Sequence, residues 1–135
     1  MNIAQQLPNP LNNFVIDVPA HQYYDFELSP DSTYPLKGVT YPVDYGHINS
    51  YTAEDGHELD LFVGNSADGL AGVVLVDRGS NTPNEHKFYV GLSAEEVSDI
   101  IDQLKPVLIS HHEIATTKDL LTAIDQFKDP DKLLV

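Results

Sequence analysis

The stretch that decides the fold reads Tyr-Pro-Val-Asp-Tyr-Gly-His-Ile from residue 41 to residue 48, and Asp-Gly-His-Glu-Leu-Asp-Leu-Phe-Val from residue 55 to residue 63. Asp55-Gly56 is a strong tight-turn signal, and apolar and polar side chains alternate after it. The alternation predicts a strand from His57 to Val63 with Asp60 on the face opposite the leucines. Two carboxylates on short, stiff elements, Asp55 and Asp60, suit a hard divalent cation, and the plain alternative is a solvated hairpin tip.

Composition and charge limit what the chain can bind. Its 135 residues fit one domain, and 7 Lys plus Arg against 21 Asp plus Glu give a formal net charge of −14. An acidic surface repels nucleic-acid backbones and anionic membranes, so we expect neither as a partner. Cysteine is absent, which excludes disulfides and thiolate chemistry. The sequence also lacks an apolar run of bilayer length and a signal sequence, and we therefore expect a cytoplasmic protein.

Hydrophobic patterns divide the rest of the chain into elements. Residues 1–12 are rich in Asn, Gln and Pro, which predicts an extended arm. Six strands are expected near residues 14–18, 24–28, 41–48, 57–63, 72–76 and 86–92. A capping box at Ser93 and Glu96 starts a helix that Pro106 ends, and a second helix starts near Thr116 or Thr117. The order predicts a mainly β (α+β) fold in a single domain over residues 1–135, a small OB-like β-barrel of five to six strands with two C-terminal helices packed outside.

The central stretch resembles the soluble, family I type inorganic pyrophosphatases. Their signature reads Asp-(small)-Asp-(Pro or Glu)-hydrophobic-Asp-hydrophobic, preceded by a Tyr-Pro-x-x-Tyr-Gly element. That element is intact at residues 41–46, and six of the seven signature positions match in residues 55–61. His57 stands where the signature has its middle aspartate. The resemblance covers roughly residues 14 to 92 and implies a short, divergent member of this family.

The resemblance also implies roles for individual residues. It implies metal ligation by Asp55, Asp60, Glu85 and Asp17, with Asp77 as the nearest candidate for a further ligand. It implies catalytic roles for His57, Asp55 and Tyr45, with His57 or a metal-activated water as the base, and phosphate binding by Lys87, Tyr45 and Lys118. Lys37 and Arg78 are candidates to replace two substrate-binding cations of the family.

Plainer interpretations of the same residues stay open. Glu85 and Lys87 share one face of a predicted strand and suit a surface ion pair. Asp17 lies at a strand end, where a solvated carboxylate is common, and Lys118 lies near a helix start, where lysine is ordinary. Among the six histidines, His57 and His47 flank the motif and are the candidates for the site.

These residues predict a cofactor and an activity. The resemblance implies Mg²⁺ as the cofactor, and because neutral imidazole at His57 weakens a site for hard cations, Mn²⁺ and Zn²⁺ are the alternatives. The resemblance implies divalent-metal-dependent hydrolysis of inorganic pyrophosphate to two phosphates, in a homo-oligomer, because bacterial members are commonly hexamers. Two alternatives stay open: a catalytically impaired binding or assembly protein with the pyrophosphatase fold, and a phosphohydrolase for another phosphate anhydride or ester.

Overall fold

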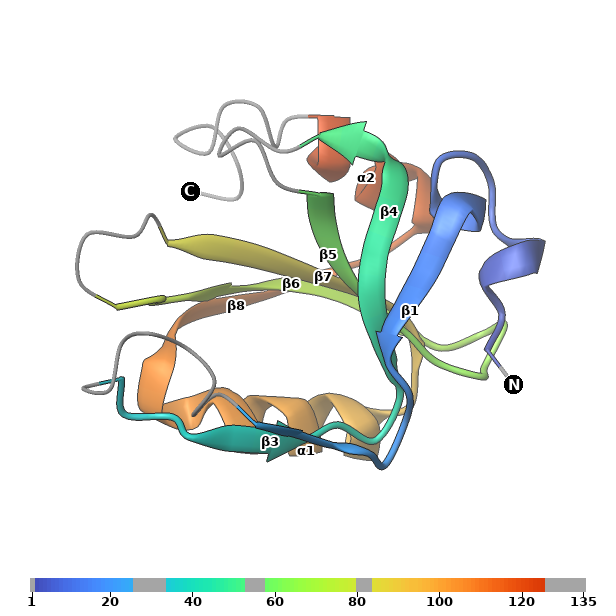
Figure 1. Ribbon diagram of the computed structural model, residues 1–135. Coiled ribbons are helices and arrows are strands. Elements are labelled where there is room, and N and C mark those ends of the chain that lie inside the picture. Colours follow the sequence, from blue (N-terminus) through green and yellow to red (C-terminus); the bar gives the residue numbers. More distant parts are fainter. Residues whose placement is uncertain (1, 26–33, 53–57, 80–83, 126–135) are drawn as a thin grey trace.

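The computed structural model describes residues 2–25, 34–52, 58–79 and 84–125, and these form eight strands and two α-helices (Figure 1). The strands are β1 (Phe14–Val18), β2 (Tyr23–Asp25), β3 (Gly38–Thr40), β4 (Asp44–Thr52), β5 (Glu58–Val63), β6 (Leu70–Val76), β7 (Glu85–Leu92) and β8 (Leu108–Ile114). The helices are α1 (Ala94–Leu104) and α2 (Thr117–Asp125), with short 3-10 helices η1 (Ala4–Gln6), η2 (Leu11–Asn13) and η4 (Lys105–Val107).

Six strands form one mixed sheet in the order β1-β4-β5-β7-β6-β8, and β2 pairs with β3 in a separate ribbon. Neighbours in the large sheet run antiparallel, except that β5 and β7 run parallel. The mainly β class is confirmed. The predicted OB-like barrel is not observed, because the described strands leave β1 and β8 as the two edges of the sheet. Alternation along a strand specifies its faces, but it does not specify which strand edges meet.

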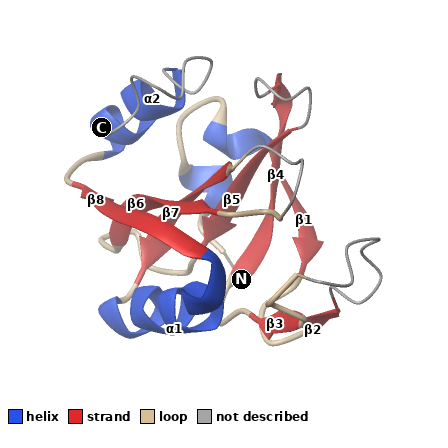
Figure 2. Ribbon diagram, turned by 90° about the vertical axis from the view of Figure 1, so that its left-hand side faces the viewer, coloured by secondary structure: helices blue, strands red, loops and turns tan. Residues whose placement is uncertain are grey.

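Both faces of the large sheet are covered (Figure 2). Leu59 and Leu61 of β5 pack in one cluster with residues of α2, whereas Phe62 packs in the other with residues of α1 and of the β2–β3 layer. Val73 and Val74 of β6 divide between the same two clusters, which confirms the predicted burial of that strand on both faces. Asp60 lies on the face of Phe62, as the alternation predicted.

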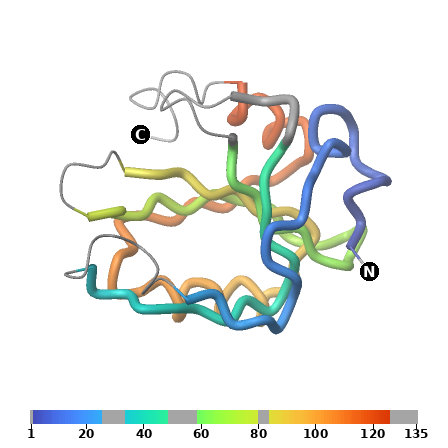
Figure 3. Tube along the Cα trace, viewed as in Figure 1, coloured from blue at the N-terminus to red at the C-terminus, as the bar shows by residue number. Residues whose placement is uncertain are grey.

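The N-terminal residues are folded against the sheet, so the prediction of an extended arm over residues 1–12 is wrong. Ile3, Ala4 and Leu11 are buried, and the backbone N–H of Ile3 donates to the carbonyl of Gly64 at 3.0 Å. Figure 3 shows this segment beside the connection between β5 and β6. The polar composition concealed a few apolar side chains that cover one end of the core.

The helical half follows the sequence signals, with one addition. The Ser93 hydroxyl accepts from the N–H of Glu96, and the Glu96 carboxylate accepts from the N–H of Ser93, which confirms the capping box. Helix α2 begins at Thr117, as predicted. Strand β8 lies between α1 and α2 along the chain and was not predicted. Residues 110–113 of this edge strand are all polar, so they show no alternation of apolar and polar side chains. No described helix combines the length and the apolar character needed to cross a membrane.

His111 of β8 contacts a tyrosine of the core across a glycine of the strand between them. The hydroxyl of Tyr89 on β7 reaches past Gly72 of β6 and lies 2.7 Å from Nε2 of His111. A side chain at Gly72 would meet the Tyr89 hydroxyl, so the contact needs glycine there. Burial lowers the pKa of His111 below its ordinary 6.5, with His112 acting in the same direction and Glu113 opposing.

We expect acidification to lower the stability of the protein through His111. Below about pH 6.5 the His111 imidazole gains a proton in the unfolded chain but stays neutral in the folded protein, because its pKa there is lower. The free energy of unfolding therefore falls as the pH falls, until the pH reaches the pKa of His111 in the folded protein. His111→Gln keeps a partner for Tyr89 without titrating. Urea midpoints at about pH 7.5 and about pH 5.5 should therefore fall more for the unsubstituted protein than for His111→Gln. Equal losses would contradict this role.

Candidate functional site

A pocket of about 250 Å³ lies between the large sheet and the layer formed by β2 and α1. Its described lining combines tyrosines, aliphatic side chains and charged groups: Tyr24, Tyr34, Leu36, Tyr41, Tyr45, Asp60, Val76, Arg78, Glu85, Lys87 and Leu104. Five lining residues were candidates from the sequence, and the fold brings these five together: Tyr45, Asp60, Arg78, Glu85 and Lys87. The mixed composition of the walls was not predicted.

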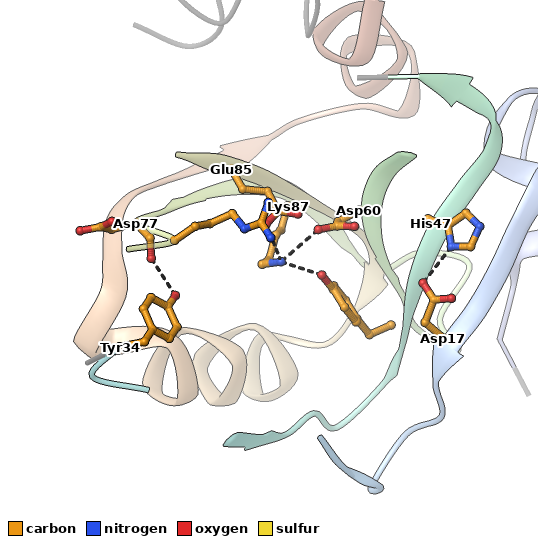
Figure 4. A network of polar contacts seen from close by, with 9 residues as sticks. Asp17, Tyr34, His47, Asp60, Asp77, Glu85 and Lys87 are labelled. Atoms are coloured by element: carbon orange, nitrogen blue, oxygen red, sulfur yellow. Dashed lines mark hydrogen bonds and ion pairs between the residues drawn. The ribbon is translucent and has the colours of Figure 1, made fainter. Parts of the chain in front are cut away.

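The strand order explains why Asp60 and Lys87 meet. Strands β5 and β7 are parallel neighbours, and Asp60 and Lys87 are partners in their register. Residues at matching positions on adjacent strands project from the same face. Tyr45 joins them from β4, which pairs with the other side of β5. Figure 4 shows the Asp60 carboxylate directed at the Lys87 ammonium.

Lys87 is the centre of the polar network. Its Nζ donates to the Tyr45 hydroxyl at 2.6 Å and to Oδ2 of Asp60 at 3.1 Å, and it lies 3.5 Å from Oε2 of Glu85. The ammonium also lies 4.9 Å from the centroid of the Tyr45 ring, within cation–π range. Because the side chains of Lys87 and Glu85 are only 11% and 17% exposed, their contact is largely removed from solvent and is not the surface ion pair of the plainer interpretation.

The environment fixes the protonation states of this cluster. Burial by itself lowers the pKa of Lys87, but the Asp60 carboxylate, assisted by Tyr45 and Tyr41, outweighs burial and raises that pKa above 10.5. Burial raises the pKa of Tyr45 well above its ordinary value and that of Tyr41 to about 12, although Lys87 opposes both shifts. At neutral pH Lys87 is therefore an ammonium and both tyrosines are neutral. Lys87 can bind an anion, but it cannot act as a nucleophile.

Arg78 extends the polar network from Glu85 toward solvent. Its Nε lies 3.0 Å from Oε2 of Glu85, and Arg78 is about two-fifths exposed. The Tyr34 hydroxyl donates at 2.7 Å to the backbone carbonyl of Asp77, just before Arg78 (Figure 4). The carboxylate of Asp77 is exposed and accepts from the N–H of Gly79 at 2.9 Å. Asp77, the candidate for a further metal ligand, is absent from the described pocket lining.

Asp17 lies in a separate contact. Its Oδ2 is 2.8 Å from Nδ1 of His47, and neither residue is part of the described lining. The register between β1 and β4 shifts between Ile16 and Val18, so Asp17 is the extra residue of a β-bulge. The bulge turns the carboxylate toward His47, on the β1 side of the site in Figure 4. The structure thus pairs Asp17 with a histidine, away from Lys87.

The other predicted residues divide into two groups. Asp55 and His57 lie outside the described residues. Lys37 and Lys118 are exposed and absent from the described lining. Lys118 lies in the first turn of α2, whose buried residues pack on the opposite face of the sheet from the pocket. Helix α2 was correctly predicted, but a helix start does not specify the face of the sheet that it covers.

Asp60 and Glu85 are the carboxylates in the described lining of the pocket, and no group of three or more histidine or acidic side chains among the described residues is placed to hold a metal ion. Mg²⁺ in proteins commonly takes one or two carboxylates and completes its coordination with water and phosphate oxygens. Asp60 and Glu85 line the same pocket and lie on adjacent strands, each within 3.5 Å of Lys87. These two residues would hold the cation.

The fold and pocket define a mainly β protein with a partly buried cluster of alternating charges beside a wall of tyrosines and leucines. No family model, curated protein or solved structure matches the chain.

Proposed function

We propose that this pocket is the active site of a divalent-metal-dependent hydrolase that splits inorganic pyrophosphate into two phosphates. The row of alternating charges at the pocket carries the proposal, since Asp60, Lys87, Glu85 and Arg78 each contact a group of opposite charge. Two members of the cluster come from the stretches that resemble the pyrophosphatases: Tyr45 from the Tyr-Pro-x-x-Tyr-Gly element and Asp60 from the aspartate signature.

The balance of charge favours a metal–pyrophosphate complex over a bare polyanion. Two carboxylates and two cations in the row cancel formally, and the whole chain carries −14. A free polyanion would meet no net attraction in this row and an opposing overall field. A metal-bound polyanion offers charge of both signs, so the carboxylates can face the metal while Lys87 and Arg78 face phosphate oxygens.

The described residues then have distinct roles in the reaction. Asp60 and Glu85 would hold the divalent cation, which would supply positive charge for the phosphate oxygens and lower the pKa of water. Lys87 and Arg78 neutralise charge on the departing phosphate. The neutral Tyr45 hydroxyl fixes the position of the Lys87 ammonium. A water oxygen bonds to one phosphorus, the bridging P–O bond breaks, and two phosphates leave.

Phosphate release from pyrophosphate across Mg²⁺, Mn²⁺ and Zn²⁺ tests this proposal. We expect metal-dependent release that Asp60→Asn lowers at least about 100-fold, because the variant keeps the shape of the side chain without its charge. Asp17→Asn is the matched control, since Asp17 is absent from the described lining, and it should release phosphate like the unsubstituted protein.

Two other outcomes would change the assignment. If saturating metal gives no release above the Asp60→Asn level while pyrophosphate still binds, the protein is a binding module, and hydrolysis is wrong. If His57→Asp then restores Mg²⁺-dependent phosphate release, the histidine that replaces the middle aspartate of the signature is the cause of the lost activity.

A further inference from the structure

The pocket has two unlike sides. The sheet side contributes the charged groups, from β5, from β7 and from the residues after β6, together with Tyr41, Tyr45 and Val76, whereas the opposite layer contributes aromatic and aliphatic groups alone. The opposite wall includes Tyr24 of β2, Leu104 of α1, and Tyr34 and Leu36 from the segment before β3. Leu36 and Leu104 also belong to the hydrophobic cluster that lies between the sheet and α1, so the wall is continuous with the core. The pocket is therefore amphipathic, with charge on one side and apolar surface on the other.

Inorganic pyrophosphate uses only one of these sides. All its surface atoms are phosphate oxygens, and polar groups that are moved against apolar surface lose hydration without gaining a hydrogen bond. An organic group attached to a diphosphate would instead replace water on the rings and aliphatic side chains. Tyr24 lines this wall and remains 38% exposed, so its side chain is accessible to a ligand.

We propose that the natural ligand of this pocket is a compact organic diphosphate, whose phosphates meet Lys87 and Arg78 and whose apolar or aromatic group lies on the Tyr24 wall. The inference rests on the proposed function, because it assumes that the charged side binds a phosphoanhydride. The volume of about 250 Å³ sets the size, since pockets for drug-sized ligands start at about 300 Å³. The organic group is therefore a single ring or a short alkyl chain.

The corresponding reaction is hydrolysis of the phosphoanhydride bond. A water oxygen forms a bond to the terminal phosphorus, and the bond from that phosphorus to the bridging oxygen breaks. The bridging oxygen stays on the organic monophosphate, inorganic phosphate leaves, and one proton is released to solvent. No oxidant or further reactant is required.

Binding of phenyl diphosphate and of inorganic pyrophosphate, each measured by calorimetry with Mg²⁺, tests the inference. We expect phenyl diphosphate to bind about fivefold tighter, in line with the contribution of one aromatic contact. Tyr24→Ala should remove this preference by weakening phenyl diphosphate alone. Tyr23→Ala is the matched control: Tyr23 is the neighbouring residue of β2, is 59% exposed and lies over Gly38 of β3, but it is absent from the described lining.

The outcomes separate this inference from the proposed hydrolysis. Equal affinity for the two anions, or equal weakening of both by Tyr24→Ala, overturns the organic ligand even if pyrophosphate is hydrolysed. A preference for phenyl diphosphate that depends on Tyr24, without phosphate release from either compound, supports the ligand class and overturns hydrolysis. If neither anion binds, both proposals are wrong.

Discussion

Lys87→Met is expected to abolish phosphate release and to lower the free energy of unfolding by about 3 kcal/mol. Methionine keeps the apolar stem of the side chain but removes the ammonium that donates to Tyr45 and Asp60. Glu85 keeps its contact with Arg78, whereas the Asp60 carboxylate, with only 18% of its side chain exposed, loses the ammonium at 3.1 Å. Removing one partner of a buried ion pair leaves an uncompensated charge, which costs more than the pair contributes. Urea unfolding at neutral pH and a phosphate-release assay measure the two effects.

Two further variants sharpen this prediction. Lys118→Met removes a lysine for which the resemblance to the pyrophosphatases implied phosphate binding. Because Lys118 is exposed on α2, the variant should stay within about 0.5 kcal/mol of the unsubstituted protein and keep its activity. Combining Lys87→Met with Asp60→Asn should destabilise less than the sum of the two single changes, because the second removes the stranded charge. Strict additivity would show that an unpaired Asp60 charge is not what destabilises Lys87→Met. A loss of phosphate release in Lys118→Met would instead show that the site extends beyond the cluster around Lys87.

The strand faces of the charged residues in the pocket could be predicted from the sequence, for a physical reason. Strand periodicity is local, so the alternation after Asp55 was enough to place Asp60 opposite the leucines, and Glu85 and Lys87 on one face of their strand. The resemblance to the pyrophosphatases then suggested that these faces belong to one site. The parallel pairing of β5 with β7, which puts Asp60 beside Lys87, has no local signal because the two strands are separated by the whole of β6.

The aromatic side of the pocket shows what local patterns miss. Tyr24 and Leu36 belong to short or irregular segments, and Leu104 occupies an ordinary apolar position of an amphipathic helix. Each residue by itself indicates only packing. They form a wall because α1 and the β2–β3 ribbon cover the same face of the sheet, and that arrangement depends on chain connections rather than on periodicity. The bulge that turns Asp17 toward His47 was also unpredictable, because it depends on how β1 pairs with β4 and not on the periodicity of β1 itself.

Gly46→Ala is expected to destabilise the protein by more than about 3 kcal/mol, although the change adds a single methyl group. Gly46 lies opposite Ile16 in the ladder between β4 and β1, and an added Cβ would overlap the backbone carbonyl of Val15. Backbone atoms held in a sheet cannot move aside as a flexible side chain can. Strand β1 would therefore have to separate from β4.

The damage from Gly46→Ala should reach the pocket, because Gly46 directly follows Tyr45. A displaced β4 moves the hydroxyl that accepts from Lys87 at 2.6 Å, so phosphate release should fall together with the urea midpoint. Val15→Ala is the matched control: it trims a side chain that is 40% exposed while it leaves the backbone contact intact, and it should cost less than about 1 kcal/mol. If both variants unfold at the same urea concentration, the close approach of β1 to Gly46 is not what holds this edge of the sheet. A large loss for Gly46→Ala alone would show that the glycine of the Tyr-Pro-x-x-Tyr-Gly element is needed for strand packing, and that it supports the site by holding Tyr45 in place.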